Sequence, residues 1–491
     1  MKKALIVTLI IIAFFSLTAC LYAKPITWDR FTTDFLAISK LHLDLPLTKS
    51  ALKGARNYPI SRSEAIYLLV GSLGLNFEAN LLKNVSSIPQ VKKCPYFLRG
   101  AINLAMLSKP PIINNKKLVN LKWLKGSLSE SEAKTLIRRA LFLRKNGLKI
   151  EWTEKISKDL VLHWERKLDP PLYICYLKLN LRSKNLKLVP ELAGTHVQDK
   201  EKLSEMCKRK GAIAGINGGF FAPDGDPIGA LMINGVLISE PFPHRGCFGW
   251  NEKGEFVFGM ADWEGEVKSD SGVSILLDGL NRKPIGDEAI LYTPFYGEKV
   301  KLRKGGVEVV VRKWKVKLIR ESGEHYIPRD GFIIVGYGEK GGLLSRLRKE
   351  EKVEVHAYLI PTGKNPLWRK ITYLIQGGPT LIENYKIANY DENFKESFLM
   401  KKHPRTIIGE SSDGKLILMV VDGRTPYHSE GLTIEELKEL LVKMKFKNAL
   451  NLDGGGSTCI YFNNRLYNLP SDSGKEREIS YGLLILPKKK R

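Results

Sequence analysis

The chain has 491 residues, more than one hydrophobic core usually supports, so we expect two domains. Hydrophobic residues make up 43% of it and charged residues 26%, which excludes a largely disordered chain and a protein with many membrane spans. The net charge of +26 is spread along the chain without a nucleic-acid-binding motif, so no nucleic-acid partner is expected. Attraction to an anionic envelope polymer or lipid surface and a simply solvated basic surface both remain open.

Residues 1–23 have the pattern of a signal peptide. Lys2 and Lys3 precede an apolar run that is too short for a membrane-spanning helix, which needs roughly 20 apolar residues. We therefore expect export to the cell envelope or the extracellular space. Residues 17–20, Leu-Thr-Ala-Cys, resemble a bacterial lipobox, which would make Cys20 a lipid anchor and the only contact with the membrane. Cleavage after Ala23 would instead give a simple secreted protein.

Residues 25–145 are expected to form a small all-helical domain with two copies of one unit. Ser61 and Glu64 have the spacing of a capping box at the start of an apolar helical run. Ser129 and Glu132 repeat the same spacing before a second run. The two segments should therefore begin their helices in the same way.

These boxes resemble the helix starts of S-layer homology repeats. Residues 94–96, Cys-Pro-Tyr, followed by an apolar segment, are similar to the first helix of such a repeat, although a third repeat is not evident. The resemblance implies non-covalent attachment to cell-wall polysaccharide. A plain helical spacer is the alternative. The polar, mixed stretch 146–169 is expected to be a linker.

Residues 170–488 are expected to form a second domain with an α+β fold. Short apolar runs typical of strands are separated by the hairpin turns Asn234-Gly235 and Asp413-Gly414, and tight hairpins join antiparallel strands. Helical spacing is found at 200–209 and at 433–444. We therefore predict a mixed, largely antiparallel sheet with flanking helices.

Four clusters place glycines beside polar groups at the ends of apolar runs, where backbone amides can approach a ligand. In the first, a buried strand meets a polar turn and two rings suited to a sugar face: Asn217, Gly218, Gly219, Phe220 and Phe221. The second, residues 375–379, ends its strand at Gly378. As bare patterns, both are also ordinary strand-ending turns.

The third cluster joins two strands across the Asp413-Gly414 hairpin. Arg405 and Thr406 begin one strand, and Asp422 ends the other, so antiparallel pairing should bring Arg405 and Asp422 to one edge. This pair is either a structural salt bridge or part of a phosphate clamp.

The fourth cluster is the sharpest pattern in the chain. Asp453 is followed by Gly454, Gly455, Gly456 and Ser457. Three glycines cost conformational entropy on folding, and a backbone nest around an anion would use them directly. The Gly-Lys-Ser/Thr ending of a nucleotide-binding P-loop is absent from this sequence.

Together the clusters offer carboxylates, a guanidinium group, amide-rich turns and rings, which suit cleavage of a bond between a sugar and a phosphate. The sequence lacks a Gly-x-Ser-x-Gly elbow and a His-Glu-x-x-His helix, which removes the commonest serine and zinc hydrolases.

The four clusters, in this order, resemble the phosphodiester glycosidase family, which includes N-acetylglucosamine-1-phosphodiester alpha-N-acetylglucosaminidase, over residues 170–488. The resemblance implies a hydrolase that cleaves the glycosidic bond of an N-acetylglucosamine-like sugar-1-phosphodiester, on envelope or extracellular polysaccharide. It places the site at Asn217 with Gly218 and Gly219, Gly378, Arg405 with Thr406, Asp422, and Asp453 through Ser457.

The expected roles follow from these residue types. Arg405 and the turn 453–457 would hold the phosphate, Asp453 or Asp422 would transfer a proton, and Asn217 would orient the sugar. No cofactor is required by the pattern, and a divalent cation such as calcium remains open. Two alternatives are a non-catalytic protein that binds cell-wall polysaccharide and a metal-dependent phosphodiesterase with Asp422 and Asp453 as ligands.

Overall fold

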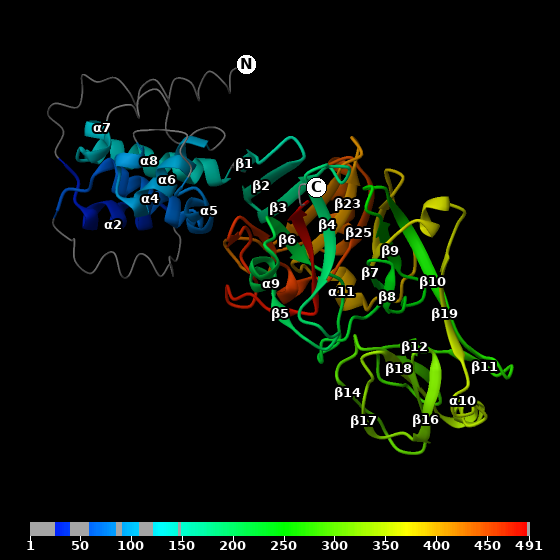
Figure 1. Cartoon of the computed structure of the whole chain (residues 1–491). Helices are drawn as coiled ribbons and strands as arrows, with labels where there is room; N and C mark the ends of the chain where they lie inside the picture. Colours follow the sequence, from blue (N-terminus) through cyan, green and yellow to red (C-terminus); the bar gives the residue numbers. More distant parts are fainter. Residues whose placement is uncertain (1–24, 40–57, 85–90, 108–120, 146–148, 489–491) are drawn as a thin grey trace. The chain divides into compact units, whose positions relative to one another are not determined.

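The computed structural model describes residues 25–39, 58–84, 91–107, 121–145 and 149–488 (Figure 1). The chain divides into two compact units. Unit 1 comprises Met1–Thr153, Trp164–Tyr173 and Thr425–Glu430, and unit 2 comprises Glu154–His163, Ile174–Arg424 and Gly431–Arg491. The expected signal peptide and lipobox lie outside the described residues. Of the helices in the described ranges, none has the length and apolarity needed to cross a membrane.

Unit 1 contains a set of short helices. They are α2 (Trp28–Ser39), α4 (Arg62–Ser72), α5 (Asn76–Leu81), a 3-10 turn (Val91–Lys93), α6 (Tyr96–Leu107), α7 (Leu121–Lys125) and α8 (Glu130–Lys145). Their apolar faces form a small core that includes Ile66, Leu69, Ile102 and Ile137. The helical runs predicted after Ser61 and after Ser129 correspond to α4 and α8.

Both predicted capping boxes form. The Glu64 amide donates to Ser61 Oγ at 3.3 Å, and the Ser61 amide donates to Glu64 Oε2 at 2.9 Å. The same two bonds join Ser129 and Glu132, at 3.3 and 2.9 Å. Arg62 pairs with Glu132 at 2.9 Å, so the starts of α4 and α8 lie side by side. The resemblance to S-layer homology repeats stays a prediction.

The prediction of a linker at 146–169 is wrong over most of this stretch, because it contains the strands β1 (Lys149–Lys155) and β2 (Leu160–Leu168). Along β2 every second residue is buried, beginning with Leu160, Leu162 and Trp164. The polar residues of this strand, among them His163, Glu165 and Lys167, lower its mean hydropathy without breaking the period of two that marks a strand. A linker has no such alternation.

The largest sheet of unit 2 carries the third and fourth clusters. Six of its eight strands, in the order of their pairing, are β3 (Pro171–Leu179), β24 (Leu416–Val421), β23 (Arg405–Ser411), β25 (Phe446–Asn451), β21 (Thr380–Glu383) and β22 (Lys386–Ile387). Each neighbouring pair in this series is antiparallel. The predicted Asp413-Gly414 hairpin joins β23 to β24.

Two further sheets carry the first and second clusters. One has the order β27 (Arg465–Leu466), β26 (Ile460–Phe462), β6 (Ala214–Asn217), β29 (Tyr481–Pro487) and β4 (Leu186–Leu192). The other has the order β11 (Ser274–Leu277), β10 (Phe256–Ser269), β9 (Gly246–Trp250), β20 (Tyr373–Gln376), β7 (Leu231–Ile233) and β8 (Val236–Ser239), and β19 (Val353–Pro361) also pairs with β10. The predicted α+β fold with largely antiparallel sheets is confirmed.

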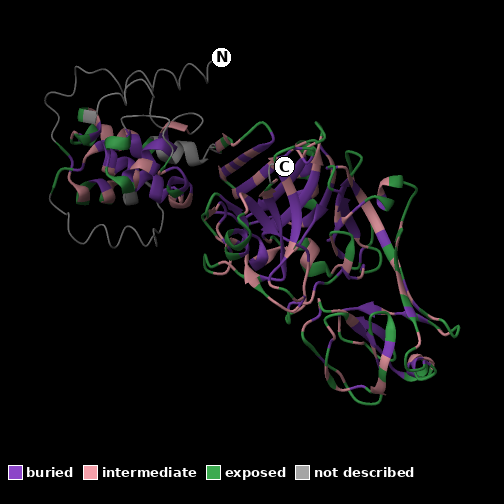
Figure 2. Ribbon diagram, viewed as in Figure 1, coloured by how far each residue is buried: buried purple, intermediate pink, exposed green. Residues whose placement is uncertain are grey.

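Helices and short strands complete the main part of unit 2. They are β5 (Glu201–Lys202), which pairs with β28 (Glu478–Ile479), and the helices α9 (Leu203–Lys210), α11 (Glu396–Met400) and α12 (Ile434–Lys443), with 3-10 turns at Pro366–Arg369 and Gly455–Ser457. Figure 2 shows the strands of this part largely buried. The rigid sheets therefore hold the loops that form the candidate site.

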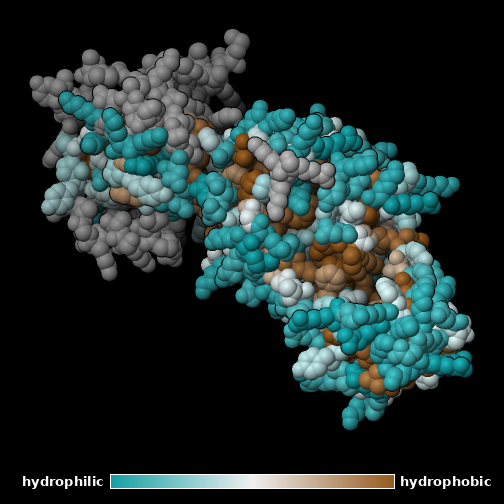
Figure 3. Space-filling model, in the orientation of Figure 1, coloured by the Kyte–Doolittle hydropathy of each residue, from teal (hydrophilic) through white to brown (hydrophobic). Residues whose placement is uncertain are grey.

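A lobe of unit 2, residues 270–352, lies at the far end of the long β10–β19 ribbon (Figure 1). It contains β12 (Gly279–Leu280), β13 (Ala289–Tyr292), β14 (Lys299–Lys301), β15 (Val307–Arg312), β16 (Lys315–Glu321), β17 (Glu324–Tyr326), β18 (Gly331–Gly336) and α10 (Gly338–Leu344). Val309, Val311 and Ile334 belong to its own hydrophobic core. Where the ribbon leaves the main part, Figure 3 shows an apolar hollow, lined in part by Trp263, Trp314 and Trp368.

Candidate active site

A pocket of about 720 Å³ opens in unit 2 where the glycine turn after β25, the start of β23 and the segment around α11 meet. Among the described residues that line it, one carries a carboxyl group, Asp453. The basic side chains in the lining are Arg245, Lys395, Lys401, Arg405, Arg424 and Arg477, and the rings are Phe220, Phe221, Phe242, Phe394 and Phe398. The pocket is therefore strongly positive, with an aromatic wall.

Asp453 is half-buried at the end of the β25 segment. Burial raises the pKa of its carboxyl group to about 6, although the Ser457 hydroxyl, the Gly454 amide and two arginines act in the opposite direction. The Gly454 amide donates to Asp453 Oδ1 at 2.9 Å. A carboxyl group with this pKa titrates just below neutrality, which suits proton transfer or nucleophilic attack.

The glycines after Asp453 let basic side chains approach the backbone closely. A Cβ on Gly456 would lie 2.1 Å from Arg477 Nη2, and Gly455 has a φ of +60° with Arg424 Nη2 3.1 Å from its Cβ position. A larger residue at position 456 would push the Arg477 guanidinium away. Gly454, Gly455 and Gly456 all line the pocket.

Asn217 lies beneath the pocket, where its side chain is 1% exposed. Its Nδ2 donates to the carbonyls of Asp453 and Gly218, at 2.8 and 3.2 Å. Its Oδ1 accepts from Thr406 Oγ1 and from the Cys459 amide, at 2.9 and 3.1 Å. These four bonds use the full capacity of the amide, so Asn217 does not orient a sugar as expected. It instead holds the backbone carbonyl of Asp453.

Asp422 also lies away from the pocket lining and is 1% exposed. Its Oδ1 accepts from Asn468 Nδ2 at 3.1 Å, and its Oδ2 accepts from the Leu469 amide at 2.8 Å. In the β23–β24 register Arg405 pairs with Val421, so the next residue, Asp422, points to the opposite face. The two residues therefore share an edge of the sheet but not a site.

Arg405 lies on the pocket wall but is mostly engaged by the protein. Its Nε donates to the Leu432 carbonyl at 2.9 Å, and its Nη2 donates to the carbonyls of Phe398 and Lys401, at 2.8 and 3.1 Å. Three of the five N–H groups of its guanidinium are thus used, and the two on Nη1 remain for a ligand. Burial and the nearby Arg424 lower the pKa of Arg405 to about 10, so it stays cationic.

The remaining predicted glycines serve close packing. A Cβ on Gly218 would lie 2.3 Å from the Tyr481 ring, and one on Gly378, whose φ is +142°, would lie 2.7 Å from the Phe394 ring. Among the described residues, Gly218, Gly378, Gly219 and Thr406 do not line the pocket. Ser457 is buried beside Asp453 and lowers the pKa of that carboxyl group. Phe220 and Phe221 do line the pocket.

Several lining residues escaped prediction from the sequence. Arg424 Nη2 lies 3.1 Å from His403 Nδ1, and burial together with Arg424 and Arg405 lowers the pKa of His403, so its imidazole is neutral. Arg424 has a φ of +59°. The residues around it in the sequence do not indicate that its side chain lines a pocket. Arg245 and Phe394 come from loops that only the tertiary fold brings to the pocket.

Part of the chain that forms this pocket matches a known family. Residues 305–486 match the family model of phosphodiester glycosidase, so the family resemblance is confirmed for this stretch, which includes Arg405 and Asp453. The chain is 30% identical over 156 residues to the N-acetylglucosamine-1-phosphodiester alpha-N-acetylglucosaminidase of Bos taurus. This alignment covers 31% of the chain and 27% of the bovine protein, so the chain spans about a quarter of that relative.

Two solved structures have a similar fold. A hypothetical protein from Synechocystis has a TM-score of 0.62 and 22% identity, over 69% of this chain and 64% of that chain. A protein of Burkholderia pseudomallei K96243, named as an exported protein, has a TM-score of 0.57 and 20% identity, over 74% of this chain and 82% of its own. At these identities the similarity shows the fold alone.

Proposed function

We propose that the chain hydrolyses the bond between the anomeric carbon of an N-acetylglucosamine-like sugar and the phosphate of a sugar-1-phosphodiester. The observation that carries this proposal is the lining of the pocket, which sets one carboxyl group among basic side chains and beside aromatic rings. A phosphodiester is an anion that guanidinium groups bind well, and rings suit the apolar faces of a sugar. Envelope or extracellular polysaccharide would supply such a bond.

The chemistry of the leaving group explains why one carboxyl group is enough. Cleavage at the anomeric carbon releases a phosphate monoester, whose second pKa is about 6, so the departing oxygen needs no proton from an acid. Arg424 and Arg477, which lie near Asp453, and Arg405 stabilise the charge that moves onto this phosphate. A glycosidase that expels a sugar alkoxide instead needs a second carboxylic acid for that proton.

Asp453 acts on the other side of the scissile bond. Its carboxylate either takes a proton from the attacking water or attacks the anomeric carbon itself, and water completes the reaction to give free sugar and a phosphate monoester. With a pKa of about 6, Asp453 is ionised at pH 7 and is a stronger base than an exposed aspartate. Asn217 holds the Asp453 backbone in place through its 2.8 Å hydrogen bond.

A divalent cation such as calcium does not fit this lining. Calcium takes about six to eight oxygen ligands, several of them carboxylates. Among the described lining residues, the pocket offers a single carboxyl group surrounded by cations. Asp422, the second ligand in the metal-dependent alternative, has its two oxygens bonded to Asn468 and Leu469. These placements favour attack at carbon over metal-dependent attack at phosphorus.

Hydrolysis in water enriched in oxygen-18 tests the proposal. With the full chain and the methyl phosphodiester of N-acetylglucosamine 1-phosphate, we expect the label in the released sugar and none in the methyl phosphate, as measured by mass spectrometry. Label in the phosphate would show attack at phosphorus and overturn the proposed mechanism. If several sugar-1-phosphodiesters all stayed intact, the non-catalytic polysaccharide-binding alternative would be favoured.

We further propose that the protein is exported and is held at the envelope, through Cys20 or through the helical repeats of unit 1. The signal-peptide pattern of residues 1–23 and the two matching capping boxes support this proposal. We expect the Cys20→Ser protein to sediment with purified cell walls, and to stay in solution with walls stripped of their polysaccharide. Equal sedimentation with both wall preparations would contradict wall-polysaccharide binding.

A further inference from the structure

Arg245 is a basic side chain of the pocket that the proposed hydrolysis does not use. Its guanidinium carbon lies 4.1 Å from the centroid of the Phe242 ring, 4.4 Å from that of Phe394 and 5.8 Å from that of Phe220. Its Nε is buried and has no hydrogen-bond partner among the described residues. Arg245 is therefore a partly desolvated cation on an aromatic platform.

No carboxylate of the described chain forms an ion pair with this guanidinium. The Glu392 carboxylate attracts the Arg245 guanidinium electrostatically but forms no ion pair with it. The two Glu392 oxygens accept hydrogen bonds from the amides of Thr380 and Gly246, at 2.7 and 3.2 Å. Burial lowers the pKa of Arg245, yet a guanidinium keeps its charge at neutral pH. Desolvating a cation costs free energy that an anionic ligand would recover.

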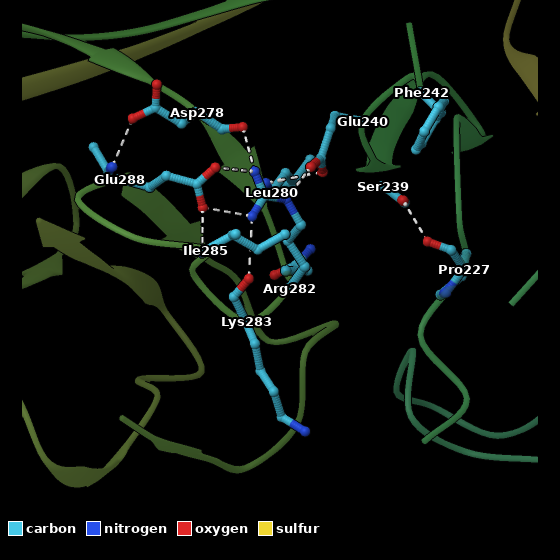
Figure 4. Close-up of polar contacts among 12 residues, drawn as sticks. Pro227, Ser239, Glu240, Phe242, Asp278, Leu280, Arg282, Lys283, Ile285 and Glu288 are labelled. Atoms are coloured by element: carbon cyan, nitrogen blue, oxygen red, sulfur yellow. Dashed lines mark hydrogen bonds and ion pairs between the residues drawn. The ribbon is translucent and has the colours of Figure 1, made fainter. Parts of the chain in front are cut away.

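The protein holds the Arg245 segment firmly. The buried Gln376 amide donates to the carbonyls of Phe242 and Arg245, at 2.9 and 3.2 Å, and accepts from the Phe242 amide at 2.6 Å. At the other end of the segment, Figure 4 shows Glu240 paired with Arg282, which also pairs with Glu288 at 2.7 Å. The guanidinium is thus placed before any ligand arrives, which lowers the entropy lost on binding.

Arg245 and Arg405 contact the two different rings of a stacked pair. The Arg405 guanidinium carbon is 4.8 Å from the Phe398 ring centroid. The Phe398 and Phe394 rings are stacked with centroids 5.0 Å apart, and Arg245 lies against Phe394. The two guanidinium groups therefore contact different rings of this stack.

We infer that the substrate carries a second anionic group, a carboxylate or a phosphate monoester, which Arg245 binds beside the Phe394 ring. This inference rests on the proposed hydrolysis of a sugar-1-phosphodiester and narrows its substrate to doubly charged compounds. The second charge belongs either to the sugar, as in a uronic acid, or to the group beyond the phosphodiester.

Three substrates separate these cases. The first is the methyl phosphodiester of N-acetylglucosamine 1-phosphate, the second its counterpart with a carboxylate at C6, and the third a diester whose alcohol is glycerol 3-phosphate. For the full chain we expect kcat/KM about tenfold higher on one of the two doubly charged substrates than on the first. The preferred one identifies the source of the second charge.

The Arg245→Met variant keeps the packing against the rings and removes the charge. It is expected to lose about tenfold more kcat/KM on the preferred substrate than on the singly charged one. Arg312→Met removes an exposed arginine of the lobe and is expected to keep the preference of the parent. Equal losses on all three substrates in Arg245→Met, or no preference in the parent, would overturn the inference.

Calorimetric binding separates this inference from the proposed reaction. The probes are N-acetylglucosamine 1-phosphate, its 6-phosphate derivative and its 1-diphosphate. The parent should bind one of the two more highly charged probes about tenfold more tightly than the first, and Arg245→Met should lose this difference. If that result came without any hydrolysis, the proposed reaction would fail and the anion site would stand. Equal binding of all probes by the parent would overturn the site.

Discussion

Replacing Asp453 with asparagine is expected to lower kcat for a sugar-1-phosphodiester by about a thousandfold. The amide is nearly isosteric with the carboxyl group and can keep the contact with Gly454, but it cannot take a proton or attack the anomeric carbon. Substrate binding should change little, because the basic side chains around position 453 remain. Release of free sugar, followed under saturating substrate, measures the loss.

Asp330→Asn is the matched control for this variant. Asp330 is an acidic residue of the lobe that pairs with Arg312 at 2.7 Å. The control should retain the kcat of the parent, and circular dichroism should show that both variants are folded. An Asp453→Asn enzyme within tenfold of the parent would remove Asp453 from the chemistry.

The pH profile gives the same assignment an independent check. If Asp453 acts as base or nucleophile, its ionised form is the active one, so kcat/KM should rise with pH up to about 6 and then level off. Below that pH the activity should fall about tenfold per unit, because the carboxylate is progressively protonated. A profile that falls above pH 6 would instead make Asp453 a general acid.

Arg405→Ala is expected to destabilise unit 2 by about 3 kcal/mol or more. The substitution removes three hydrogen bonds from a charged group, one buried bond to the Leu432 carbonyl and two part-buried bonds to the carbonyls of Phe398 and Lys401, and a hydrogen bond of this kind contributes about 1.5 to 3 kcal/mol. It also removes the cation that packs on the Phe398 ring. Urea denaturation gives the change in the free energy of unfolding.

Arg405→Lys should recover part of this loss, because an ammonium group can reach some but not all of the three carbonyls. Arg312→Ala, an exposed arginine, should change the free energy of unfolding by well under 1 kcal/mol. If Arg405→Ala were as stable as Arg312→Ala while binding phosphodiesters poorly, Arg405 would be a ligand group alone. Its hydrogen bonds to the three carbonyls would then contribute little to the free energy of unfolding.

Local sequence patterns predict much of this fold. Hairpin turns, capping boxes and the period of the apolar residues depend on neighbours in the chain, so the antiparallel sheets and the starts of α4 and α8 follow from the sequence. The glycine turn after Asp453 can also be recognised in the sequence. Three glycines in a row cost conformational entropy on folding, so a run of this kind points to a functional turn. These features need no knowledge of the tertiary structure.

Side-chain direction and long-range contacts do not follow from the sequence. Asn217 and Asp422 have suitable chemistry, but the register of their strands turns both side chains into the protein. Arg245 is positioned by Gln376, a residue 131 positions further along the chain. Stretch 146–169 reads as a linker because its polar residues hide an alternation that becomes evident only when neighbouring strands cover one face.

The bonding of Asn217 also affects the chemical ageing of the protein. In a flexible chain, an Asn-Gly pair deamidates readily, because the glycine nitrogen attacks the side-chain carbonyl carbon. Here the Gly218 nitrogen donates to the Tyr481 carbonyl at 3.0 Å, and Asn217 Oδ1 is held by Thr406 and Cys459. Deamidation would set a carboxylate against the Asp453 and Gly218 carbonyls. The active protein should therefore lose this amide only as fast as the surrounding strands open.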